Sequence, residues 1–185
     1  MKVLGLSGSL RKESWNLKLL RNMLEITAEK GVQTALFDLN GVPMFHPDVE
    51  AQQGIPADAE SLRDAVREAD AVIIACPEYN GSMTAALKNA LEWLSRRGNL
   101  LNGKVFFIMG TGPGRSACAR MHVHASYSLE SEGGFVLHQP RVLLPQVANF
   151  MDESGSITDS EVRGLLDQAA TTLIRYTESL ANMHN

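Results

Sequence analysis

The sequence predicts a three-layer α/β fold in which a five-stranded parallel sheet carries helices on both faces. Five apolar runs alternate with amphipathic segments along the 185 residues, which is typical of strands joined by helical crossovers. The runs "AVIIACP" and "VFFIMG" are apolar at consecutive positions, as in parallel strands that are buried on both faces. With the strand order 2-1-3-4-5, a ligand site is expected where the order reverses, between the first and third strands.

The order of the elements follows from these runs and from local capping signals. Strands are expected at residues 2–7, 33–38, 71–77 and 104–110, with a weaker one at 141–144. The first helix follows the capping hydroxyl of Ser14 and ends at Gly31,. Further helical patterns cover residues 57–69, 84–96, 116–132 and 158–181. Residues 40–56, rich in proline, form the longest irregular piece, which suits either a functional loop or a plain surface excursion,.

Length and composition indicate one globular domain, residues 1–185,. The excess of 21 acidic over 17 basic residues leaves no broad basic surface for nucleic acid,. Two cysteines outside any CxxC spacing provide neither a zinc site nor a disulfide framework, which suits a reducing cytoplasm,. The chain shows no export leader and no apolar run of about 18 residues, so no membrane anchor is expected.

The loop "GSLRKESWN" after the first strand has the composition of an anion site. The hydroxyls of Ser9 and Ser14, the amide of Asn16 and the guanidinium of Arg11 can converge with helix N–H groups on a phosphate,. The loop lacks both GxxxxGK[ST] and GxGxxG, which disfavours a nucleoside triphosphate or a dinucleotide there,. In the alternative reading, Ser14 only caps the helix, and Arg11 and Lys12 are solvated,.

The loop "PEYNGS" after the third strand is the second candidate. Pro77 ends the strand because it lacks an N–H, and the chain then turns through Asn80 and Gly81,. Tyr79 and exposed peptide groups could cover an aromatic ring system and bind its edge,. An ordinary turn is the alternative.

Three motifs, "GLSGSLRKESWN", "PEYNGSMTAALKNALEWLS" and "GPGRSACARMHVH", resemble the NAD(P)H-dependent FMN reductases of flavodoxin-like fold, which include quinone, chromate and azo-dye reductases. The resemblance covers nearly the whole chain. It implies that the FMN phosphate and ribityl chain are surrounded by Ser9, Leu10, Arg11, Ser14, Trp15 and Asn16. It also implies that the isoalloxazine ring is lined by Pro77, Glu78, Tyr79, Asn80 and Gly81, and is closed over by a third loop near Thr111 and Gly112.

The resemblance further implies an enzyme that takes hydride from NADH or NADPH and reduces a small-molecule acceptor by a ping-pong mechanism. Quinones, chromate, azo or nitro compounds and free flavin are the acceptor classes. Because hydride transfer needs no general base, no catalytic side chain is expected. Family members form dimers or tetramers in which a neighbouring subunit completes the site, and residues 43–56 are the candidate for that wall.

Two departures from the family pattern concern space over the flavin. Thr84-Ala85 stands where the family usually has Pro-Gly, and Ala117-Cys118 where it has Gly-Gly; the added side chains could narrow the site. A flavodoxin-type electron carrier and an FMN-binding sensor or interaction protein without turnover remain alternatives. A signalling receiver domain is disfavoured, because it needs an aspartate where this chain has Cys76-Pro77.

Histidine and cysteine positions indicate no metal site. His122 and His124 are about 200° apart around a helix and cannot share a metal, so one should face solvent and the other a neighbour,. His46, His138 and His184 have no ligand spacing. Cys76 is expected to pack as a small hydrophobe, whereas Cys118, near a helix start, could have a lowered pKa and a redox role,.

Overall fold

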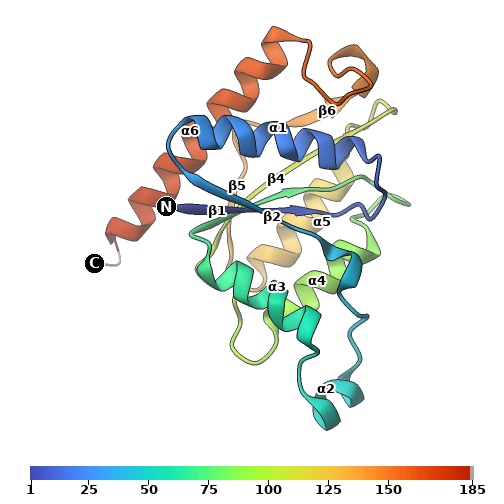
Figure 1. Ribbon diagram of the computed structural model, residues 1–185, viewed down its shortest axis with the longest axis vertical. Coiled ribbons are helices and arrows are strands. Elements are labelled where there is room, and N and C mark those ends of the chain that lie inside the picture. The colour runs from blue at the N-terminus through green and yellow to red at the C-terminus, as the bar shows by residue number, and fades with distance from the viewer. Residues whose placement is uncertain (184–185) are drawn as a thin grey trace.

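A computed structural model describes residues 1–183 and confirms the predicted three-layer α/β architecture (Figure 1). The main sheet is parallel, with the order β2-β1-β3-β4-β5, as predicted. Its strands are Lys2–Ser7 (β1), Gln33–Phe37 (β2), Ala71–Ala75 (β3), Val105–Gly112 (β4), Phe135–Leu137 (β5) and Leu143–Pro145 (β6). The carboxyl ends of β1 and β3 therefore adjoin where the strand order reverses.

The last part of the sheet differs from the expected single strand at residues 141–144. β5 pairs with the first half of β4, at Val105 to Phe107, and β6 pairs with its second half, at Gly110 to Gly112. The eight-residue β4 is long enough for both partners. Pro140 lies in the chain between β5 and β6 and has no N–H to donate to the backbone hydrogen bonds of the sheet. The two short strands therefore pair with β4 separately. "FVL", the three residues of β5, is too short to stand out as an apolar run.

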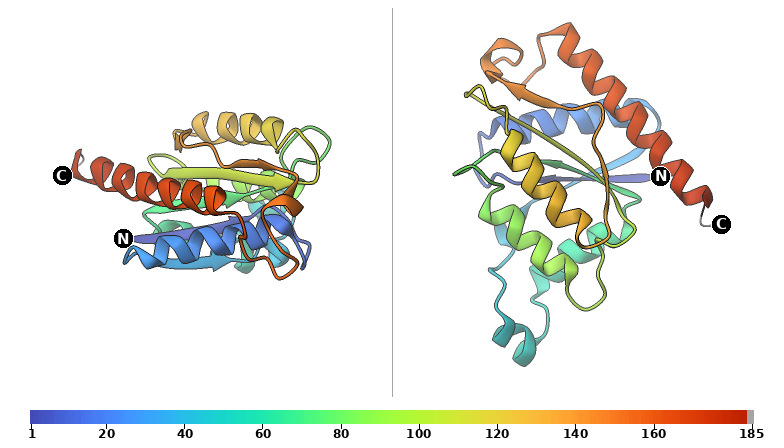
Figure 2. Two further views of the ribbon diagram at one scale, coloured as in Figure 1. Left: turned by 90° about the horizontal axis from the view of Figure 1, so that it is seen from above. Right: turned by 180° about the vertical axis from the view of Figure 1, so that it is seen from behind.

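Helices cover both faces of the sheet (Figures 1 and 2). They are Trp15–Glu29 (α1), Pro47–Gln53 (α2), Ala57–Glu68 (α3), Ala85–Ser95 (α4), Ala119–Glu130 (α5) and Ser160–Met183 (α6), with 3-10 turns at Leu39–Gly41 and Val147–Asn149. α1 and α6 pack on one face, where Ile73 and Phe107 point, and α3, α4 and α5 pack on the other, where Ile74 and Phe106 point. Adjacent strand residues thus enter different cores, which explains the consecutive apolar positions.

α5 begins at Ala119, three residues after the predicted start at Ser116. Ala117 and Cys118 adopt left-handed backbone conformations, with φ of 48° and 62°, and so cannot belong to the helix. Glycine adopts this left-handed conformation without penalty. Because Ala117 and Cys118 carry side chains, the conformation should destabilise the folded protein by about 1–2 kcal/mol at each of them. This is where the resembling family carries Gly-Gly.

Residues 40–56 contain α2 and are fastened to α4, instead of forming an entirely irregular loop. The Asn89 side chain accepts a hydrogen bond from the Phe45 N–H (2.7 Å) and donates one to the Pro43 carbonyl (2.9 Å). The buried Glu50 carboxylate pairs with Arg96 (2.9 Å) and Arg97 (3.4 Å). The hydrogen bond from Arg96 lowers the pKa of the Glu50 carboxyl. Residues 40–56 are therefore held against α4 and the residues that follow it.

The two helical histidines lie on different sides of α5, as predicted. His122 is buried, with its ring centroid 5.7 Å from that of His138, whereas the exposed His124 contacts the Ser82 hydroxyl at 2.8 Å. Within residues 1–183, no three His, Cys, Asp or Glu side chains are grouped as metal ligands would be. His184 lies outside the described residues. No helix in the described part of the chain has the length and apolar character needed to cross a membrane.

Candidate functional site

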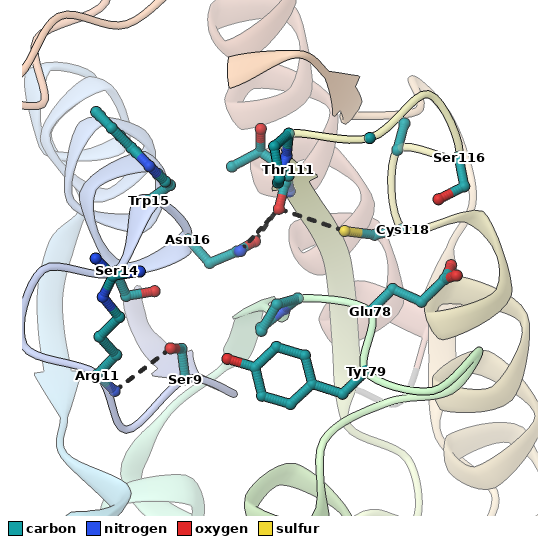
Figure 3. Close-up of a pocket in the computed structure, with 15 residues that line it drawn as sticks. Ser9, Arg11, Ser14, Trp15, Asn16, Glu78, Tyr79, Thr111, Ser116 and Cys118 are labelled. Atoms are coloured by element: carbon teal, nitrogen blue, oxygen red, sulfur yellow. Dashed lines mark hydrogen bonds between the residues drawn. The ribbon is translucent and has the colours of Figure 1, made fainter. Parts of the chain in front are cut away.

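A cavity of about 340 Å³ lies beyond the carboxyl ends of β1, β3 and β4, between the loops that follow them (Figure 3). Most of the residues expected at the site line it: Ser9, Arg11, Ser14, Trp15, Asn16, Pro77, Glu78, Tyr79 and Gly112. The two loops singled out in the sequence therefore meet at the predicted place.

Three expected residues lie outside this lining. Leu10 faces a second cavity on the other side of the first loop. Asn80 and Gly81 form the tip of a turn with positive φ, which Tyr79 and Ser82 close through two backbone hydrogen bonds of 3.0 Å. Sequence reasoning missed Pro113, Gly114 and Ser116 of the third loop, whereas Ala117 and Cys118, which were expected beside the flavin, do line the cavity. The signal was present, because these residues fall within "GPGRSACARMHVH".

The first two loops touch because Gly8 allows it. The Gly8 N–H donates to the Ala75 carbonyl at 2.8 Å, and a Cβ at position 8 would lie 2.5 Å from the Cys76 Sγ. Thr84 Oγ1 donates to the Gly8 carbonyl at 2.6 Å and accepts the Leu87 N–H at 3.2 Å as the cap of α4. Thr84 is thus buried at the junction, and neither it nor Ala85 lines the cavity. Of the two departures from the family pattern, Ala117-Cys118 is therefore the one that can narrow the cavity, because both residues line it.

Asn16 joins the start of α1 to the end of β4. Its buried side-chain amide donates to the Thr111 carbonyl and accepts the Thr111 N–H, both at 2.9 Å (Figure 3). Thr111 Oγ1 in turn donates to the Leu144 carbonyl at 2.8 Å. The Asn16 amide therefore faces Thr111. It positions the third loop against the first loop.

The anion end of the cavity is formed by Ser9, Arg11 and Ser14. The Ser9 hydroxyl oxygen accepts the Arg11 N–H, and the Ser14 hydroxyl oxygen accepts the Leu17 N–H, each at 3.4 Å. Ser14 caps α1 and also lines the cavity, so its capping role does not exclude it from the candidate site. The Arg11 guanidinium is exposed and makes no ion pair within residues 1–183. Two hydroxyls, an unpaired guanidinium and a helix N-terminus together favour a phosphate.

The other end of the cavity is lined by Pro77, Glu78 and Tyr79 of the loop after β3. Tyr79 is 55% exposed and points across the cavity toward Ser9 (Figure 3). The Glu78 carboxylate, only 8% exposed, pairs with the Arg120 guanidinium and accepts the Arg120 N–H at 3.0 Å. Glu78 therefore holds the start of α5 against the loop after β3. An aromatic side chain beside a shaped opening suits a planar ligand.

Both cysteine thiols are buried, and burial disfavours the redox role considered for Cys118. Burial raises the pKa of the Cys118 thiol, which donates a hydrogen bond to the Thr111 carbonyl at 3.4 Å. Although Cys118 precedes α5, desolvation outweighs the helix terminus, and a redox-active thiolate is not favoured. Burial also raises the pKa of the Cys76 thiol to about 11, as expected for a small buried hydrophobe,.

We expect both thiols to resist an aromatic disulfide reagent at pH 8. A pKa near 11 cuts the thiolate fraction of Cys76 about 100-fold relative to an unfolded thiol,. Because the folded state keeps a proton that the unfolded state loses, the free energy of unfolding should fall as the pH rises from about 9 toward 11. Labelling with and without denaturant checks this, and Cys118→Ser reports Cys76 alone. Rapid native labelling of that variant would contradict the assignment.

The fold and the cavity define the class of protein: a flavodoxin-like α/β protein with a cavity beyond the carboxyl ends of its central strands. The family model described as NADPH-dependent FMN reductase matches residues 1–149. The NAD(P)H-dependent FMN reductase of Pseudomonas aeruginosa is 36% identical over 174 residues, which cover 94% of this chain and 93% of that protein. The quinone reductase of Escherichia coli K12 is 33% identical over 180 residues, covering 96% of this chain and 94% of that protein.

A solved structure, the flavoenzyme NAD(P)H:(acceptor) oxidoreductase from Paracoccus denitrificans, matches with a TM-score of 0.86 and 28% identity, over 96% of this chain and 97% of that one. The chain belongs to the NADPH-dependent FMN reductase family and is an oxidoreductase. Membership confirms the resemblance seen in the sequence and, at the level of the family, FMN and NAD(P)H as the expected cofactors.

Proposed function

We propose that the cavity binds FMN, with its phosphate at Ser9, Arg11 and Ser14 and its ring between the loops that carry Tyr79 and Gly112. The observation that carries this assignment is the unpaired Arg11 guanidinium beside two hydroxyls, at the end of a cavity that opens along an aromatic side chain. The size fits, since small-ligand sites have volumes of about 300–1,000 Å³. Trp15 and Pro77 complete the walls, and Asn16 acts through Thr111.

We infer that the reaction is NAD(P)H-dependent reduction of a quinone or a similar small electrophile. Bound FMN supplies the hydride-transfer chemistry. The chain's own task is to orient the reactants, and backbone N–H groups of the loops near Tyr79 and Gly112 can stabilise negative charge beside the ring. One side of the cavity opens to solvent at Tyr79, so co-substrate and acceptor would enter the cavity there in turn. This arrangement favours ping-pong kinetics without a side-chain acid or base.

The test of this function is anaerobic reduction of the purified protein loaded with FMN. We expect NADPH or NADH to bleach the flavin absorbance, a quinone to restore it, and initial rates to give parallel double-reciprocal plots. A protein that binds FMN and is not reduced by either nicotinamide would instead be a flavodoxin-type electron carrier, a sensor or an interaction protein.

Arg11→Ala should weaken FMN binding about 10- to 100-fold, because a charge-assisted phosphate contact contributes about 1.5–3 kcal/mol. Fluorescence titration of FMN gives the Kd directly. The matched control is Arg175→Ala, which removes an exposed arginine on α6 that forms no ion pair with any described residue. Equal FMN affinity in the two variants would remove Arg11 from the site.

We propose that the chain assembles as a dimer or tetramer in which residues 43–56 of one subunit complete the cavity of a neighbour. This segment lines neither cavity beside the first loop of its own chain, yet it is held rigidly on α4 and presents Met44 at 72% exposure. A rigid projection with an exposed apolar side chain is suited to a partner surface. Light scattering should give a mass well above 20.2 kDa. A fully active monomer would contradict the shared wall.

A further inference from the structure

A second cavity of about 340 Å³ lies on the other side of the first loop, beyond the carboxyl end of β2. Its lining includes Leu10, Arg11 and Lys12 from the loop, Arg21 from α1, and Phe37 and Asp38 from the end of β2. Ser9 and Arg11 line both cavities, so a single loop separates the second cavity from the candidate FMN site.

The charged side chains of this cavity leave an excess of positive charge. Arg11, Lys12 and Arg21 form no ion pair with any of the residues that the structure describes. The neighbouring Glu13 pairs with Lys18 at 3.1 Å and so does not neutralise Lys12. Asp38 is the acidic residue in the lining, and its Oδ1 accepts hydrogen bonds from the Asn40 N–H (3.0 Å) and side-chain amide (2.8 Å). With Arg11 assigned to the phosphate in the first cavity, Lys12 and Arg21 still outnumber this one carboxylate, which favours an anionic ligand even in a chain of net charge −4,.

The remaining walls indicate what else the ligand carries. Leu10 and Leu36 are 46% and 41% exposed, and Phe37 is half-buried beside them, so an apolar surface adjoins the cations. The second oxygen of Asp38 can accept a hydrogen bond from a hydroxyl group. A phosphate, an apolar ring and a sugar hydroxyl together describe a phosphorylated nucleoside.

We propose that the second cavity binds the adenosine 2′-phosphate end of NADPH, with Lys12 and Arg21 contacting the extra phosphate. The proposal rests on the proposed function, since NADPH is the co-substrate there. The two cavities share Ser9 and Arg11 at the phosphate end of the first cavity, so the dinucleotide would extend along this loop from the second cavity to the ring end at Tyr79. The 2′-phosphate of NADPH carries negative charge that NADH lacks. Lys12 and Arg21 would therefore favour binding of NADPH over NADH.

The test uses FMN-loaded protein and adenosine 2′,5′-bisphosphate as the probe, with 5′-AMP and inorganic phosphate for comparison. We expect calorimetry to show tighter binding of the bisphosphate than of either comparison ligand. Lys12→Ala and Arg21→Ala should each weaken its binding about 10-fold. In turnover, each variant should raise the KM for NADPH by a similar factor while the KM for NADH and both kcat values stay unchanged. Arg175→Ala, which replaces an arginine that lines neither cavity, should have no effect.

Bisphosphate binding that neither variant weakens would overturn the site. Bisphosphate that binds in the cavity without competing with NADPH would overturn the co-substrate assignment, because the ligand would then be an independent phosphorylated effector. Equal rises in KM for NADH and NADPH would overturn the role of the 2′-phosphate. The calorimetric measurement needs no turnover, so it separates failure of this proposal from failure of the reductase function, which would appear as no bleaching by either nicotinamide.

Discussion

Gly110→Ala is expected to destabilise the protein by about 1–3 kcal/mol, the usual cost of forcing extra atoms into a packed core. A Cβ at position 110 would lie 2.7 Å from the Cys76 carbonyl oxygen and 2.9 Å from the Cys118 Cβ. The first of these is a backbone atom and cannot move without shifting the loop after β3. The melting temperature of the flavin-free protein should fall by about 3–10 °C. FMN affinity should fall with it, because the loops that carry Tyr79 and Cys118 are pushed apart.

Gly112→Ala provides the matched control for stability. It lies two residues further along the same strand, and an added Cβ would meet no atom within 4 Å. Calorimetric melting of the two flavin-free variants should therefore separate crowding from the general effect of replacing glycine in β4. Similar melting temperatures for both variants would show that the contact with Cys76 carries no strain.

Asn16→Asp is expected to have the second large effect, and this effect should depend on pH. The substitution keeps the acceptor for the Thr111 N–H but replaces the group that donates to the Thr111 carbonyl with a carboxylate oxygen. A buried carboxylate facing a carbonyl should cost about 2–3 kcal/mol at pH 8. Burial and the carbonyl raise the carboxyl pKa in the folded state, so stability is lost as the pH rises above the unfolded value of about 4.

Denaturant unfolding at pH 5 and pH 8 measures this effect. When protonated, the introduced carboxyl group could again donate to the Thr111 carbonyl. The decrease in the free energy of unfolding caused by Asn16→Asp should therefore be smaller at pH 5. The control is Asn149→Asp, because Asn149 is an exposed asparagine whose amide makes only a 3.5 Å contact with Gln146. An equal loss of stability for Asn16→Asp at both pH values would contradict the proposed contribution of the two hydrogen bonds between Asn16 and Thr111.

Much of the fold and several parts of the site follow from short stretches of sequence. β3 was predictable because residues 71–74 are apolar at every position, which is typical of a strand buried on both faces; in the structure Val72 and Ile74 enter one core and Ala71 and Ile73 the other,. The two candidate loops follow such strands, and the topology of a parallel sheet brings their carboxyl ends to one edge. The weakest prediction was the fifth strand, because three-residue pairings such as β5 leave little pattern to recognise.

The amino-acid sequence by itself determined the sheet order, the helical layers and the two loops that meet at the cavity, because these depend on local periodicity and on general rules of chain connection. Only the tertiary structure decided which way the polar side chains turn. Asn16 binds Thr111, Thr84 binds Gly8, and Glu78 binds Arg120, across separations of 95, 76 and 42 residues. Such contacts form between groups that meet only after the chain has folded, since a buried polar group takes whichever partner packing brings within reach.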